Sequence, residues 1–299
     1  MAVARVRGRR VAAAGGPAPD EAAARRRRTG RGRCPAYGVV RGRLPAVFGI
    51  GGVARRHTPM TFQAFTRDPV ARRRYWARSH LGWRLIARAA PNAGHRAVAR
   101  LQRAGLVDAV ITQNVDGLHG AAGSDRVVEL HGRLDEVVCL DCGNLTSREE
   151  VDRRLREANP DFVARAAAVN PDGDVDLPDE QVAGFRPVDC GICGTGMLKP
   201  DVVFFGETVP PERVARCFAL VEQARAVVVL GSSLTVMSGR RFVIRAAKHG
   251  IPVAIVNQGP TRGDGYATVC LDAPLGALLP ALADRVAGEA APLATAAGV

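Results

Sequence analysis

The stretch TQNVDGLHGAAGSDRVVELHG gathers amide, carboxylate and imidazole side chains directly after an apolar run. Gln113, Asn114 and Asp116 could orient a polar ligand, and His119 and His131 could move a proton. An imidazole suits general acid–base work because its unperturbed pKa lies near working pH. A single histidine is usually a packed or surface residue, so the chemical interpretation depends on the elements that position these side chains.

Four of the seven cysteines form two close pairs, C-L-D-C and C-G-I-C, with forty-seven residues between them. Two residues between thiols let each pair hold a metal from a tight turn, and two pairs complete a closed tetrahedral site. The sequence therefore predicts one structural zinc ion bound by Cys139, Cys142, Cys190 and Cys193. Unrelated free thiols or a redox pair are the alternatives. The long linker predicts a helical or looped excursion from Ser147 to Arg186.

Short apolar runs bounded by turn-forming residues predict buried strands at LVDAVIT, AVVVLGSS and IPVAIVNQG. Helical patterns occupy Pro59 to about Ala104 and Gly239 to His249. Strands alternating with helices favour a parallel sheet covered on both faces. We therefore expect an α/β fold: a Rossmann-like parallel sheet domain with an inserted small zinc-binding module.

Polar residues follow three of the predicted strands, and ligands of open parallel sheets bind at that edge. Backbone N–H groups and hydroxyls at such turns can approach phosphate oxygens. Each group taken alone could equally be an Asx turn or a helix cap. The predicted cofactor-binding residues are Gln113, Asn114, Val115, Asp116, Gly231, Ser232, Ser233, Asn257, Gln258 and Gly259.

The first 58 residues contain fourteen arginines against Asp20 and Glu21, so most of the net charge of +13 belongs to this leader. The leader lacks any sustained period, which predicts disorder. A transit peptide is disfavoured because the segment has no serine. The expected domains are a leader (1–50), a Rossmann-like domain (51–136 and 200–287), a zinc-binding module (137–199) and a tail (288–299).

Charge and hydropathy narrow the classes of partner. The body of the chain is nearly neutral, and its cysteine pairs lack flanking basic and aromatic residues, so no specific nucleic acid is expected. No run of eighteen apolar residues and no export signal occurs, so we expect no membrane contact and a soluble, intracellular protein.

Several motifs occur together in one order: TQNVDGLH, ELHG, the two CxxC pairs, LKPDVVFFGE, LGSSL and VNQGPT. In this order they resemble the sirtuins, the NAD-dependent protein lysine deacylases, from about Gly51 to Leu282. YWARSHLGW and PDGDVDLPDEQV look like the class II branch. The resemblance implies an NAD-dependent deacetylase or deacylase of the bacterial cytoplasm that transfers an acyl group from lysine to ADP-ribose and releases nicotinamide.

The resemblance also implies roles for individual residues. His131 would be the general base on a ribose hydroxyl. Gln113 and Asn114 would hold the ribose and a water, with Val115 in the same stretch, and Asp116 would accept a hydrogen bond from nicotinamide. Further residues would meet phosphate, ribose and adenosine: Gly231 to Ser233, Asn257 to Gly259 and Leu275. Residues for an acyl-lysine protein or peptide would be Val203, Phe204, Gly206, and the pair Tyr75 and Arg78, which could equally be packing residues.

The chain departs from the sirtuin pattern at its start. Sirtuins open with a strand, a G-A-G-x-S loop and I-P-D-[YF]-R, and neither motif is present here. An out-of-frame origin of residues 1 to about 48 is one hypothesis for this difference. Two alternative functions follow: a catalytically impaired binding module, or a protein ADP-ribosyltransferase.

Overall fold

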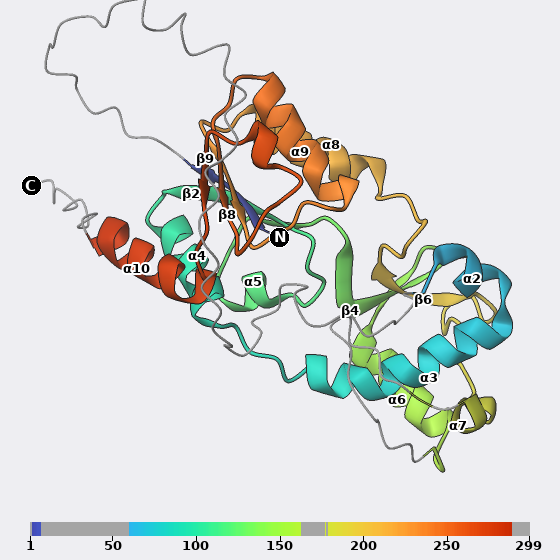
Figure 1. The fold of residues 1–299 in the computed structure, drawn as a ribbon. Helices are drawn as coiled ribbons and strands as arrows, with labels where there is room; N and C mark the ends of the chain where they lie inside the picture. Colours follow the sequence, from blue (N-terminus) through green and yellow to red (C-terminus); the bar gives the residue numbers. More distant parts are fainter. Residues whose placement is uncertain (1, 7–59, 163–176, 178, 289–299) are drawn as a thin grey trace, which may run out of the picture.

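The computed structural model describes residues 2–6, 60–162, 177 and 179–288 (Figure 1). These residues form two parts. The larger part is built on a six-stranded sheet, and the smaller part on a three-stranded sheet. Helices accompany both sheets, so the predicted α/β class with an inserted module is confirmed.

The six-stranded sheet has the order β3-β2-β1-β7-β8-β9. Its strands are β1 (Ala2–Val6), β2 (Val107–Thr112), β3 (Val127–Glu129), β7 (Val227–Leu230), β8 (Val253–Val256) and β9 (Val269–Leu271). The pairs β2–β3, β7–β8 and β8–β9 are parallel. β2, β7 and β8 are the apolar runs in which the sequence predicted strands.

β1 corrects two sequence-based expectations. Ala2–Val6 is a strand at the centre of the sheet, although the sequence predicted a disordered leader there. It pairs antiparallel with both β2 and β7, so the sheet is not wholly parallel. The short run AVARV carries β-branched residues, and its pairing satisfies backbone groups on two neighbouring strands. The rest of the leader and the tail after Gly288 lie outside the described residues.

Helices cover both faces of this sheet. α4 (Ala93–Arg103) and α10 (Leu275–Gly288) bury Leu101 and Leu279 with Val110 of β2 on one face. α8 (Pro211–Glu222) and α9 (Met237–Lys248) bury Phe242 with Val229 of β7 on the other. The short helices α5 (Leu118–Ala121) and η1 (Asp264–Tyr266) complete this part. Figure 1 shows the resulting layers of helix, sheet and helix.

The smaller part contains three strands and four helices: β4 (Gly132–Cys139), β5 (Leu145–Ser147), β6 (Leu198–Val202), α2 (Phe62–Arg67), α3 (Pro69–Ile86), α6 (Arg148–Ala158) and α7 (Asp179–Ala183). The strand order is β5-β4-β6, with both pairs antiparallel. Phe65 of α2 and Trp76 of α3 lie in one hydrophobic core with Leu155 of α6. By packing, α2 and α3 therefore belong with this part and not with the Rossmann-like domain to which the sequence assigned them. An amphipathic pattern identifies a buried face but not the surface that covers it.

Among the described helices, none combines the length and the apolar character needed to cross a membrane.

Candidate active site

Three of the predicted ligand-binding segments begin at one edge of the large sheet. Gln113, Gly231 and Asn257 directly follow β2, β7 and β8. β2 leads to β3 on one side of β1, whereas β7 leads to β8 and β9 on the other. The connections therefore diverge at the centre of the sheet, which is where open α/β sheets bind their ligands.

A polar cluster joins His131 to the segment after β2. His131 Nε2 lies 2.9 Å from Ser238 Oγ, and Gln113 Nε2 donates to the same oxygen at 3.0 Å. Ser238 lies buried in the first turn of α9. Sequence reasoning did not select it, because a serine at the start of a helix is an ordinary capping signal. Its contacts with two predicted site residues appear only in three dimensions.

Burial lowers the pKa of His131 to about 4. A backbone hydrogen bond with Gln113 opposes this shift, while Arg241 and Arg213 add to it. His131 is therefore neutral at pH 7 and able to accept a proton.

The segment after β2 is held by local hydrogen bonds. Thr112 Oγ1 accepts from the backbone N–H of Asn114 at 3.0 Å, and Asp116 Oδ1 accepts from that of Leu118 at 3.0 Å. The Val115 carbonyl accepts from the Leu134 N–H of β4 at 2.9 Å. These contacts fix the backbone of the segment against the smaller part of the molecule.

The segments after β7 and β8 are tight turns. Gly231 has a φ of +61°, and a Cβ atom there would lie 2.7 Å from Leu275 Cδ1. This close approach explains the glycine and brings Leu275 beside the predicted phosphate-binding residues. Ser232 Oγ accepts from the Leu234 N–H at 3.1 Å. Leu234, at φ 52°, is the one described non-glycine residue with a positive φ.

In the turn after β8, Asn257 Nδ2 donates to the carbonyls of Gln258 and Gly259, at 3.1 Å and 3.0 Å. The backbone N–H of Asn257 donates to the carbonyl of Leu271 in β9. Gln258 and Gly259 are exposed at this edge. The Asn257 side chain therefore stabilises the turn, and Gln258 and Gly259 at its tip stay accessible to a ligand.

His119 occupies a separate position in α5. Its ring lies 4.8 Å from the ring of His95, in edge-to-face geometry. Burial lowers the pKa of His119 to about 4, and the nearby His95 adds to the effect. Among the described residues no contact joins His119 to His131, so the structure brings His131 together with Gln113 and leaves His119 outside that cluster.

The loop after β6 lies directly against the histidine. The backbone N–H of Val203 donates to the His131 carbonyl at 2.8 Å. Within the loop, Glu207 Oε2 accepts from the Phe204 N–H at 2.8 Å. The buried Lys199 Nζ lies 3.2 Å from Glu207 Oε2 and donates to the Val202 carbonyl at 2.6 Å. A buried cation thus anchors both ends of this loop, which presents Phe205 to solvent.

Gly132 is required by the close approach of β4 and β6. Its φ is +81°, and a Cβ atom there would lie 1.8 Å from the Asp201 carbonyl oxygen. Gly132 pairs with Val202 in the sheet. A side chain at this position would force the two strands apart beside His131.

Tyr75 and Arg78, predicted for an acyl pocket, make packing contacts. The Tyr75 ring lies 5.1 Å from Phe204 and 5.4 Å from Phe65. Arg78 Nη2 donates to the Leu177 carbonyl at 3.4 Å. Tyr75 therefore touches the loop after β6, and Arg78 holds the segment before α7. Their proposed role toward an acyl group stays a prediction.

The four predicted cysteines form one cluster. Their Sγ atoms all lie within 4.8 Å of one another, with Cys139–Cys193 and Cys142–Cys190 distances of 3.8 Å. A tetrahedral zinc with Zn–S bonds of ~2.3 Å places its sulfurs about 3.8 Å apart, so the cluster fits this metal. A Cβ atom at Gly196 would lie 2.3 Å from Cys139 Sγ, which explains the glycine there. The structure thus brings together the four cysteines predicted to hold the zinc ion.

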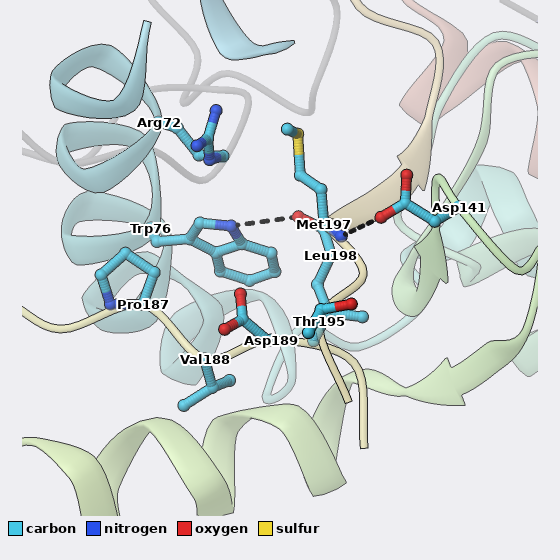
Figure 2. Close-up of a pocket in the computed structure, with 9 residues that line it drawn as sticks. All are labelled: Arg72, Trp76, Asp141, Pro187, Val188, Asp189, Thr195, Met197 and Leu198. Atoms are coloured by element: carbon cyan, nitrogen blue, oxygen red, sulfur yellow. Dashed lines mark hydrogen bonds between the residues drawn. The ribbon is translucent and has the colours of Figure 1, made fainter. Parts of the chain in front are cut away.

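A pocket of about 170 Å³ lies beside this cluster, between α3 and the chain leading into β6 (Figure 2). Trp76 Nε1 donates to the Leu198 carbonyl at 3.3 Å, and Asp141 Oδ2 accepts from the Met197 N–H at 2.9 Å. Neither His131 nor any predicted cofactor-binding residue lines it. The pocket is thus separate from the sheet edge and from the catalytic cluster.

Comparison with known proteins agrees with this geometry. A curated relative from Streptomyces coelicolor, NAD-dependent protein deacetylase 1, is 61% identical over 253 residues, covering 85% of this chain and 84% of the relative. The NAD-dependent protein deacetylase of Bordetella bronchiseptica is 50% identical, covering 75% of this chain and 81% of its own.

Solved structures of Sir2 proteins share the fold. A Sir2 homologue in complex with NAD has a TM-score of 0.59 at 29% identity, and covers 77% of each chain. A Sir2 protein bound to acetylated peptide has the same score and identity, and covers 77% of this chain and 82% of its own. The Sir2 family model itself matches residues 52–238. From its sheet edge to its cysteine cluster, the chain therefore belongs to the Sir2 family.

Proposed function

We propose that this chain is an NAD-dependent protein lysine deacetylase, with His131 as its general base. The proposal rests on the position of His131, which contacts both the cofactor edge and the loop after β6. Its imidazole reaches the cofactor edge through Ser238 and Gln113, and its carbonyl binds the Val203 N–H of the loop after β6. Relatives at 50% identity or more are named NAD-dependent protein deacetylases.

The electrostatics of His131 support the role of a base. Its lowered pKa keeps the ring neutral at pH 7, so a nitrogen is free to take a proton from a substrate hydroxyl. NAD, when bound, supplies ADP-ribose as the acyl acceptor and nicotinamide as the leaving group. The protein's own contribution is to orient the base and to hold both substrates beside it.

The donor set at the sheet edge fits a dinucleotide. Gln113, Asn114, Val115 and Asp116 would hold the nicotinamide and ribose end. The phosphates and adenosine would contact the turns after β7 and β8, through Gly231, Ser232, Ser233, Asn257, Gln258, Gly259 and Leu275. The close packing of Gly231 against Leu275 and the exposed tip at Gly259 leave backbone groups open to such a ligand.

An acyl-lysine peptide would lie along the loop after β6, at Val203, Phe204 and Gly206, where backbone groups not already bonded within the protein could pair with an extended chain. Lys199 and Glu207 make this loop rigid before a peptide arrives. Such recognition reads main chain more than side chain, which suits an enzyme acting on many proteins. A cytoplasmic location accords with this substrate class.

The test is release of nicotinamide from NAD in the presence of an acetyl-lysine peptide. We expect turnover in the parent chain, its loss in His131→Ala, and its retention in His249→Ala, a surface histidine at the end of α9. Equal turnover in both variants would show that His131 is not the base.

A second candidate, a binding module without turnover, is favoured by one observation. β1 runs antiparallel, so its carboxyl end pairs with Val107, at the edge of the sheet opposite Gln113. The carboxyl end of β1, at Val6, therefore does not lie at the cofactor edge. Calorimetric titration with NAD separates the candidates: binding with turnover supports the enzyme, whereas peptide binding without NAD binding supports the module.

A further inference from the structure

Ser238 is unusual among the serines of this fold because its hydroxyl touches two residues of the candidate active site. It is 8% exposed and lies in the first turn of α9. Helical serines commonly turn their hydroxyl back to a carbonyl of the preceding turn. Here the hydroxyl instead contacts His131 Nε2, at 2.9 Å, and Gln113 Nε2, at 3.0 Å.

Counting donors assigns a direction to these hydrogen bonds. A side-chain amide nitrogen can only donate, so Gln113 Nε2 donates to Ser238 Oγ. The Ser238 hydroxyl has one proton to donate. In the described part of the chain, the acceptor within hydrogen-bond distance of that hydroxyl is His131 Nε2. This direction of the Ser238–His131 hydrogen bond corresponds to a neutral ring with no proton on Nε2 and its proton on Nδ1.

We propose that Ser238 is a positioning residue that holds His131 in the tautomer of a base, with Nε2 unprotonated and facing the cofactor edge. The inference rests on the proposed function and adds a residue to it. When NAD is absent, the serine hydroxyl occupies the place on Nε2 that a hydroxyl of the substrate takes during the reaction. The ring therefore needs neither a change of tautomer nor a rotation before it accepts a proton.

The direct test is nitrogen-15 NMR of the imidazole side chains at pH 7. The chain has six histidines, and the His131 signals are assigned by their loss in His131→Asn. We expect the parent protein to show Nδ1 protonated and Nε2 in the range of a hydrogen-bonded acceptor. In Ser238→Ala the Nε2 signal should move to that of an unbonded nitrogen, and Ser238→Thr should restore it.

Ser124→Ala is the matched control. Ser124 is 7% exposed, and its buried hydroxyl makes no hydrogen bond within the described structure. This variant should leave the His131 signals unchanged. A parent protein with Nε2 protonated would overturn the proposal, as would His131 signals that are the same in Ser238→Ala and in the parent.

Kinetics provide the second readout. The Ser238 hydrogen bond biases the free enzyme toward the base tautomer, so its loss at ~1 kcal/mol predicts a kcat/KM for NAD about fivefold lower in Ser238→Ala. Ser238→Thr should recover most of this loss. A kcat/KM for NAD that is the same in Ser238→Ala and in an active parent refutes the role of Ser238. A parent that releases no nicotinamide refutes the proposed function instead, and the NMR result still decides the tautomer.

Discussion

Replacing Gly132 with alanine tests whether the close contact of β4 and β6 holds the candidate active site together. An alanine at a φ of +81° costs about 1 to 2 kcal/mol because its Cβ crowds the following carbonyl. The new Cβ would also lie 1.8 Å from the Asp201 oxygen, which belongs to backbone and cannot rotate away. Overpacking of this kind adds about 1 to 3 kcal/mol. The free energy of unfolding should therefore fall by about 2 to 5 kcal/mol.

Gly250→Ala is the matched control for this variant. Gly250 has a φ of +68°, but no atom lies within 4 Å of a Cβ built there. Gly250→Ala should therefore lower the free energy of unfolding only by the cost of the positive φ, about 1 to 2 kcal/mol. Both values can be measured by urea unfolding, followed by tryptophan fluorescence, because Trp76 and Trp83 lie in the core of the smaller part.

Activity gives an independent measure of the same contact. Separating β4 from β6 would displace the Val203 N–H from the His131 carbonyl, and a misplacement of about 1 Å can cost ~100-fold in rate. Gly132→Ala should show such a fall in kcat/KM for the peptide, whereas Gly250→Ala should not. If the two variants lose equal stability, the strand contact is not the constraint that the structure indicates.

Three further predictions concern pH, the buried lysine and the metal. The pKa of His131 is about 4 when folded and 6.5 when free, so the unfolded chain binds more protons between these values. The free energy of unfolding should therefore fall as pH drops from 6.5 to 4. Urea unfolding at a series of pH values should show a weaker pH dependence of this free energy in His131→Asn. Lys199→Met should raise the peptide KM and cost about 3 kcal/mol by leaving Glu207 unpaired, whereas Lys199→Met/Glu207→Gln should regain part of that stability. Mass spectrometry should find one zinc per chain in the parent and in Cys270→Ser, and none in Cys190→Ser.

The sequence was sufficient to predict the features that depend on local pattern. Short apolar runs identified β2, β7 and β8, and the spacing of the cysteines identified the metal site. Strands buried on both faces need continuous apolar residues, and a metal knuckle needs two thiols in one turn, so both leave a local trace.

Features that depend on distant partners left no such trace. β1 pairs with β2 and β7, more than one hundred residues away, and its five residues give no period by which to detect it. The helical pattern of α3 did not reveal that Trp76 packs with the smaller part. Ser238 resembles any serine at a helix start until His131 and Gln113 are placed beside it.

β4 also lies between the two proposed binding regions, the loop after β6 and the segment after β2. From Gly132 to Val137 it advances five residues while β6 advances two, from Val202 to Pro200, so three residues bulge out of the pairing. Leu134, inside this bulge, contacts the carbonyl of Val115 at the cofactor edge. One strand thus lies beside the proposed peptide loop at its start, the predicted cofactor segment at its bulge and the cysteine cluster at its end.

If a bound ligand displaces β4 at one of these contacts, the displacement acts on the other two. Thermodynamic reciprocity then requires that peptide and cofactor change each other's affinity by the same factor. Under that condition the bulged strand would couple the binding of the two substrates.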